Sequence, residues 1–179
     1  MRLGRPIRDQ AWLVPDHTGL PAWYLCTKLP LFDPEGTVSG IAGILRPFDH
    51  AGTAPQEYHR LTPALELVTT SYHRPLRTTE LAKQCGLSVS QLQREFRRLF
   101  GMSPSEYILR TRLLLAQRML DRSAAGVGEV AVACGFYDQS HFTKAFKAHT
   151  GLPPQAYRRR SRQRAAEGWE DIDEEAKPV

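Results

Sequence analysis

The sequence contains few cysteines and lacks any long run of apolar residues. Cys26, Cys85 and Cys134 have no CxxC or Cys/His spacing among them, so they predict isolated buried thiols and argue against a disulfide framework or a structural zinc site. No stretch approaches the roughly 20 apolar residues that a membrane span needs. The charged N-terminus has no apolar run behind it, unlike a secretory signal. These absences predict a soluble, cytoplasmic protein with no membrane partner.

Positive charge is concentrated in the middle of the chain. The 179 residues are 41% hydrophobic, which is enough to form a core, and their formal net charge is +5. Residues 61–164 hold seventeen Lys and Arg but only seven Asp and Glu, whereas residues 1–60 hold six of each kind. A basic segment favours a polyanionic partner such as nucleic acid, because bound phosphates release their counterions.

The first 50 residues have β character. Apolar and polar residues alternate from Trp23 to Leu29 and predict a strand that runs to Pro30. The sequence DPEG at 33–36 predicts a turn, since proline presets the turn and glycine accepts a positive φ. A second β-prone run follows from Val38 and ends near Pro47. The pattern predicts a small hairpin, which is marginal alone in water, followed by a linker over residues 51–60.

From Leu61 the apolar period changes from two to about 3.6, which predicts helices. Seven are expected, at about 61–74, 79–85, 89–100, 104–121, 127–134, 139–149 and 154–160. Gly86 and Gly101 end two of them, and Ser103 followed by Pro104 and Glu106 begins the longest. The fold class predicted for the chain is mainly α.

Two segments of this helical region repeat each other. LAKQCGLSVSQLQREFRRLFGMSPSEY (81–107) matches VAVACGFYDQSHFTKAFKAHTGLPPQAY (130–157), first at an offset of 49 and then, after one extra residue, at 50. In each segment a glycine ends one helix, and an apolar residue fills the corner before the next. A helix, a sharp glycine turn and a second helix predict a helix-turn-helix unit.

The second helix of each segment has one apolar and one polar face. Leu92 and Phe96, like Phe142 and Phe146, are four residues apart and are expected to face inward. The opposite faces carry Ser90, Gln91, Gln93, Arg94 and Arg97, and Gln139, Ser140, His141, Lys144 and Lys147. For a single helix such a face is most often simply solvated. Because the face recurs after the same turn, inside a basic segment, we interpret both helices as readers of the DNA major groove.

The helix expected at 104–121 joins the two units. Its 18 residues would measure roughly 27 Å. A rigid spacer of that size can place two recognition helices about one DNA turn apart, roughly 34 Å, on one side of the duplex. One chain could then contact two adjacent major grooves.

Residues 61–160 resemble the C-terminal DNA-binding domain of the AraC family of transcription regulators, most closely in VAVACGFYDQSHFTKAFKAHTGLPPQAYR at 130–158. The resemblance implies seven helices, two helix-turn-helix units and asymmetric promoter sites. It also implies DNA contacts from Ser90, Gln93, Arg94, Arg97, Gln139, Ser140, His141 and Lys144. Gly126-Val127-Gly128 departs from the family pattern and predicts a loose entry to the fifth helix.

The N-terminal segment WYLCTKLPLFDPEGTVSGIAGILRPF (23–48) resembles the last strands of a PAS-type sensor domain. Residues 1–50 are about half the length of such a domain, so the resemblance implies a partial, structural segment. His17, Cys26 and His50 form no ligand constellation, and no cofactor or metal is expected.

The end of the chain is basic and then acidic. Arginines at 158–164 are expected to extend the phosphate contacts, and residues 161–179 are expected to be a disordered tail. The expected partners are promoter DNA, RNA polymerase and, through the N-terminal segment, a second copy of the chain. Cys26 lacks the neighbouring cysteines that would activate a thiolate, so we expect no enzyme activity. Two alternatives remain: a non-specific architectural DNA binder, and a protein-interaction module that acts through the hairpin edge.

Overall fold

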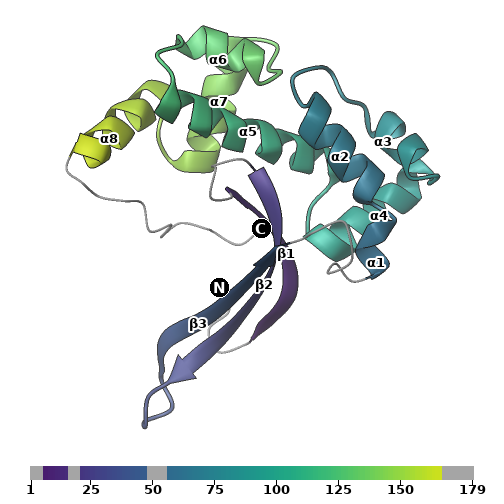
Figure 1. Cartoon of the computed structure of the whole chain (residues 1–179), viewed down its shortest axis with the longest axis vertical. Helices are drawn as coiled ribbons and strands as arrows, with labels where there is room; N and C mark the ends of the chain where they lie inside the picture. Colours follow the sequence, from purple (N-terminus) through teal and green to yellow (C-terminus); the bar gives the residue numbers. More distant parts are fainter. Residues whose placement is uncertain (1–5, 16–20, 48–55, 167–179) are drawn as a thin grey trace.

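The computed structural model describes residues 6–15, 21–47 and 56–166. Two helical units lie side by side above a narrow sheet that projects away from them (Figure 1). Of the residues considered above, His17, His50 and the acidic residues beyond 166 lie outside the described ranges. Within those ranges, no helix is both long and apolar enough to cross a membrane.

The sheet has three antiparallel strands in the order β1-β2-β3. They are β1 (Ile7–Pro15), β2 (Pro21–Phe32) and β3 (Val38–Pro47). The predicted hairpin is β2–β3. Its turn forms as expected, because Gly36 has a φ of +81° and the Thr37 N–H donates to Asp33 Oδ1 at 2.7 Å. The sequence pattern missed β1, since its first half, Ile-Arg-Asp-Gln, shows no apolar alternation.

In the described residues eight helices follow the sheet, and seven of them correspond to the seven expected helices. They are α1 (Gln56–His59), α2 (Thr62–Ser71), α3 (Thr78–Gln84), α4 (Val89–Phe100), α5 (Pro104–Arg122), α6 (Val127–Ala133), α7 (Gln139–Thr150) and α8 (Pro154–Ala166). The predicted mainly α fold is confirmed. Helix α8 continues to Ala166, beyond the expected boundary at 160. The Gly126 N–H donates to Glu129 Oε2 at 2.6 Å, so the start of α6 is capped where a loose entry was expected.

The helical units have separate cores that share α5. The first core surrounds Phe96 and Phe100 and takes Tyr107 and Ile108 from the start of α5. The second surrounds Phe142 and Phe146 and takes Leu113, Ala116 and Leu120 from the rest of it. Helix α5 therefore runs from one unit into the other, as Figure 1 shows.

The repeat is reproduced in the backbone and in the packing of rings. The Leu87 N–H donates to Ala82 O at 2.9 Å, and the Phe136 N–H donates to Ala131 O at 3.0 Å. The rings of Phe96 and Tyr107 are 5.5 Å apart at 79°, and those of Phe146 and Tyr157 are 5.3 Å apart at 81°. Each unit is thus closed by the same edge-to-face aromatic pair.

The end of the expected linker is ordered. Helix α1 brings Tyr58, which is 4% exposed, onto the first core, where its ring lies 5.7 Å from that of Phe100. Leu25 of β2 is buried in the same core. The sheet, through Leu25, and α1, through Tyr58, are therefore both joined to the first helical unit by apolar contacts.

Tyr58→Ala should lower the free energy of unfolding by about 3 kcal/mol, because it leaves a cavity between α1 and α4. Its neighbour His59 is exposed, so His59→Ala should change stability by no more than about 0.5 kcal/mol. Urea unfolding of both variants checks this. Equal small effects would contradict the packing of α1 on the first core.

Candidate nucleic-acid interface

Helix α4 begins with a reciprocal cap. Ser88 Oγ accepts from the Gln91 N–H at 3.2 Å, and Gln91 Oε1 accepts from the Ser88 N–H at 2.9 Å. The cap therefore occupies the Gln91 side chain, although it belongs to the outward face. Leu92 and Phe96 are fully buried. Facing away from them are four exposed residues: Ser90, Gln93, Arg94 and Arg97.

Helix α7 is built in the same way with different residues. Asp138 Oδ1 accepts from the His141 N–H at 2.7 Å, and Phe142 and Phe146 are fully buried. On the opposite face Gln139, Ser140, His141, Lys144 and Lys147 are exposed. The His141 ring packs edge-on against Phe136 at 5.5 Å, so one side of that imidazole is fixed by the protein.

The cations on these two faces are available for an external anion. Arg98 of α4 is bound by Glu95, whose Oε2 accepts from Nε at 3.0 Å and from Nη2 at 2.9 Å. In contrast, Arg94, Arg97 and Lys144 form no ion pair within the described ranges. Exposed cations without an internal partner are suited to phosphate or to guanine edges.

The structure gathers the eight sequence-predicted residues into two groups. Four lie on α4 and four on α7, and both helices pack against α5. The first group is near the start of α5 and the second near its other end (Figure 1). The two groups therefore form two separate exposed surfaces, on two helices that both pack against α5.

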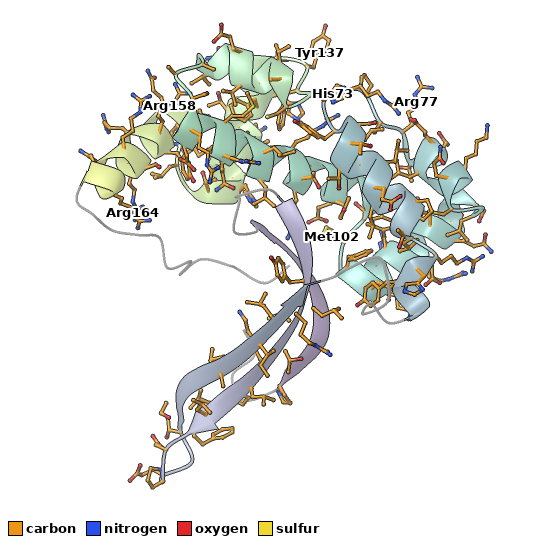
Figure 2. The ribbon with its side chains drawn as sticks, in the orientation of Figure 1. His73, Arg77, Met102, Tyr137, Arg158 and Arg164 are labelled. Carbon is orange, nitrogen blue, oxygen red and sulfur yellow. The ribbon has the colours of Figure 1, made fainter. Side chains whose placement is uncertain are left out.

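Sequence reasoning missed an exposed aromatic residue next to the second surface. Tyr137 is 94% exposed and immediately precedes the cap of α7. Figure 2 shows its side chain projecting from the surface. The one-residue insertion in the second repeat falls in this turn, and that insertion was the only signal in the sequence.

The basic residues of α8 do not all face outward. Arg158 Nε donates to Leu120 O at 3.2 Å, and its Nη2 donates to Ala125 O at 2.6 Å. Arg158 therefore ties α8 to the end of α5. Arg159, Arg160, Arg162 and Arg164 are exposed, and the prediction that they extend the phosphate contacts concerns these four.

The cysteines are suited to packing. Burial raises the pKa of the Cys26 thiol, and it raises the pKa of Cys134 to about 11. Both thiols stay protonated at neutral pH and are therefore poor nucleophiles. No group of three His, Cys, Asp or Glu side chains in the described part of the chain could hold a metal ion.

Asp138→Ala should destabilise the second unit by about 1 kcal/mol, because α7 loses the acceptor for its first-turn N–H groups. Asp138→Asn should keep most of that stability, since an asparagine oxygen caps a helix about as well. Thermal unfolding of both variants measures the difference. If both variants lose the same stability, the charge of Asp138 matters and its capping hydrogen bond does not.

Known proteins resemble this chain mainly in the helical domain. A family profile described as a helix-turn-helix domain matches residues 81–160. The HTH-type transcriptional regulator GbdR of Pseudomonas aeruginosa is 34% identical over 95 residues, covering 53% of this chain and 26% of that protein. The HTH-type transcriptional activator RhaR of Pectobacterium atrosepticum is 30% identical over 128 residues, covering 70% and 45%. The chain thus spans between a quarter and a half of these relatives.

Two solved structures resemble the domain over nearly their whole length. One is a transcriptional regulator with an AraC-type DNA-binding domain from Chromobacterium violaceum, with 31% identity, a TM-score of 0.56, and coverage of 59% of this chain and 94% of that one. The other is the DNA-binding domain of AdpA in complex with a target DNA, with 33% identity, a TM-score of 0.54, and coverage of 59% and 98%.

Proposed function

We propose, on the premise that this chain belongs to the AraC family of helix-turn-helix proteins, that it regulates transcription by placing α4 and α7 in two adjacent major grooves of promoter DNA. One observation carries the proposal. The same exposed polar and cationic face occurs on two capped helices that pack against one continuous helix, α5.

The eight residues have different proposed contacts. Arg94, Arg97 and Lys144 would donate to guanine edges or to phosphates. Gln93 and Gln139 would pair with adenine edges, donating to N7 and accepting from the N6 amino group. Ser90, Ser140 and His141 lie in the first turns of their helices. Because helix N-termini approach the groove first in this class of motif, we assign those three to bases or nearby phosphates.

The length of α5 supports contact with two grooves. Its 19 residues span about 28 Å, and successive major grooves on one side of the duplex are about 34 Å apart. The cores that flank α5 add the remaining separation, since α4 and α7 pack at its two ends. A second copy of the chain is not needed to contact both grooves.

Arg94→Ala and Lys144→Ala should each weaken binding, by roughly 1–3 kcal/mol if the lost contact is to a base. Footprinting on a promoter duplex should show a protected site of about 20 base pairs that covers two major grooves. Titration of each variant against that duplex measures the loss.

Two arginines serve as charge-matched controls. Arg98 is held by Glu95 on α4, and Arg122 lies at the end of α5, so Arg98→Ala and Arg122→Ala should bind nearly as well as the unaltered chain. Protection of one groove only, insensitive to Lys144→Ala, would exclude α7 as a reader. Equal affinity for unrelated duplexes, with a steep dependence on salt, would favour the non-specific alternative.

The N-terminal sheet is proposed to be the last part of a PAS-like domain, distinct from the DNA-binding domain at 61–160. Its three consecutive antiparallel strands support this proposal. We also propose that it pairs with the sheet of a second copy. Strand β3 is an edge strand, and it carries Ile41, Ile44 and Leu45, which are 50%, 64% and 51% exposed. RNA polymerase is the proposed partner of the promoter-bound protein.

Ile44→Lys should abolish a dimer formed through β3, because it introduces a charge into the middle of the apolar edge. Glu35→Lys makes a larger change in charge, but in the exposed turn, and should leave the dimer intact. Sedimentation of the intact chain distinguishes the two outcomes. An unchanged mass for Ile44→Lys would count against pairing through this strand.

A further inference from the structure

Apart from α5, the two helical units are joined at a second place. The segment Tyr72-His73-Arg74, called the bridge below, follows α2 in the first unit. Gly135, in the turn between α6 and α7 of the second unit, lies directly against it. A Cβ atom on Gly135 would be 2.5 Å from Tyr72 O and 3.0 Å from His73 C and O. The turn of the second unit therefore packs on backbone of the first, at a distance that only glycine allows.

The bridge is also fixed from α5. Arg112 Nε donates to Tyr72 O at 2.8 Å, and Arg112 Nη2 donates to Arg74 O at 2.9 Å. A planar guanidinium with two donors in a fixed fork holds both carbonyls in one orientation. The neighbouring Thr111 is 1% exposed, and its hydroxyl donates to Tyr107 O at 3.0 Å. In this part of α5, where one core ends and the other begins, the polar side chains of Thr111 and Arg112 therefore both bond to the backbone of the protein.

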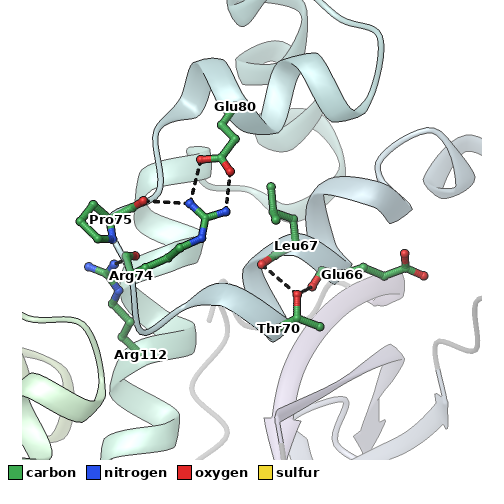
Figure 3. A network of polar contacts seen from close by, with 7 residues as sticks. All are labelled: Glu66, Leu67, Thr70, Arg74, Pro75, Glu80 and Arg112. Atoms are coloured by element: carbon green, nitrogen blue, oxygen red, sulfur yellow. Dashed lines mark hydrogen bonds and ion pairs between the residues drawn. The ribbon is translucent and has the colours of Figure 1, made fainter.

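The bridge is tied to both helix-turn-helix units. In the first unit, the guanidinium of Arg74 pairs with the carboxylate of Glu80 on α3 and donates from Nη1 to Pro75 O at 3.2 Å (Figure 3). In the second unit, the Tyr72 side chain packs against the core that contains Phe142 and Phe146. Figure 2 shows His73 at the junction of the units, with Arg77 on one side and Tyr137 on the other.

These contacts complete a closed path between the recognition helices. Helix α3 packs on α4, and α6 packs on α7. The bridge connects α3, through Glu80, to the α6–α7 turn, through Gly135, and Arg112 fastens it to the middle of α5. A helix shared by two cores sets the distance between the units, but a lateral contact is needed to stop them from turning about that helix.

We propose that Gly135, Arg112 and the bridge are positioning elements that set the angle between α4 and α7 about α5, and so determine the spacing between the two DNA half-sites that the chain accepts. This inference rests on the proposed contact with two grooves. None of these elements belongs to either exposed recognition face, so they would act through geometry alone.

The chain offers a matched control for Gly135. Gly86 occupies the equivalent turn of the first unit, with a φ of +62° against +78° for Gly135. A Cβ atom on Gly86 would meet nothing within 4 Å. Gly86→Ala and Gly135→Ala therefore carry the same backbone penalty, because both residues have a positive φ. Only Gly135→Ala also places a Cβ atom against the backbone of the bridge, so that the bridge and the turn at Gly135 must move apart.

The experiment compares two DNA duplexes. The first is selected from a randomised library by binding to the unaltered chain. The second is the same duplex with one base pair inserted between the two protected half-sites. The insertion rotates one half-site by about 34° relative to the other. The unaltered chain and Gly86→Ala should bind the inserted duplex about tenfold more weakly than the original. Gly135→Ala should lose most of that preference. Partial unfolding lowers both affinities equally, so their ratio reports positioning and not stability.

Arg112 provides a second test that does not depend on the folding of Gly135→Ala. Arg112→Met removes both donors to the bridge and should also reduce the preference for the original spacing. Arg112→Lys keeps a cation and a donor and should restore part of it. If Gly135→Ala and Arg112→Met keep the preference seen with Gly86→Ala, the positioning inference is overturned while contact with two grooves stands. If the unaltered chain itself shows no preference, both proposals fail.

Discussion

The fold depends on one constraint: α5 must bury its first residues in one core and its later residues in another. Tyr107 and Ile108 complete the first core, and Leu113, Ala116 and Leu120 complete the second. Neither unit encloses its own aromatic cluster without this helix. As a result, two helices that are distant in the sequence, α4 and α7, are held at a set distance from each other by one helix that both cores share.

Local physical chemistry explains why the helices could be predicted. Glycines with positive φ end α4 and α7 at residues 101 and 151, and Ser88 and Asp138 begin them. Each of these signals lies within a few residues of the boundary that it sets. The repeat added an internal comparison, since the glycine turn and the inward pair of apolar residues occur at matching positions in both segments.

Several features that escaped prediction depend on contacts between distant segments. Strand β1 is identified by its pairing with β2, since its own sequence alternates poorly. Tyr58 lies in a segment whose sequence is typical of a polar linker, and only the neighbouring ring of Phe100 identifies it as a core residue. In the sequence, Arg112 cannot be distinguished from the other arginines of its helix. Its structural role is shown only by its hydrogen bonds to Tyr72 O and Arg74 O. Similarly, nothing near Gly135 in the sequence distinguishes it from Gly86.

The attachment of the sheet has a mechanical consequence. Leu25 of β2 lies in the core that contains Phe96 and Phe100, and β1 lies beside α4. A force or rearrangement in the sheet would therefore reach the first helical unit through Leu25 and through the contacts of β1 with α4. Of the two helices with exposed polar faces, α4 is in contact with the N-terminal sheet through β1, so the two helical units are not equivalent with respect to that sheet.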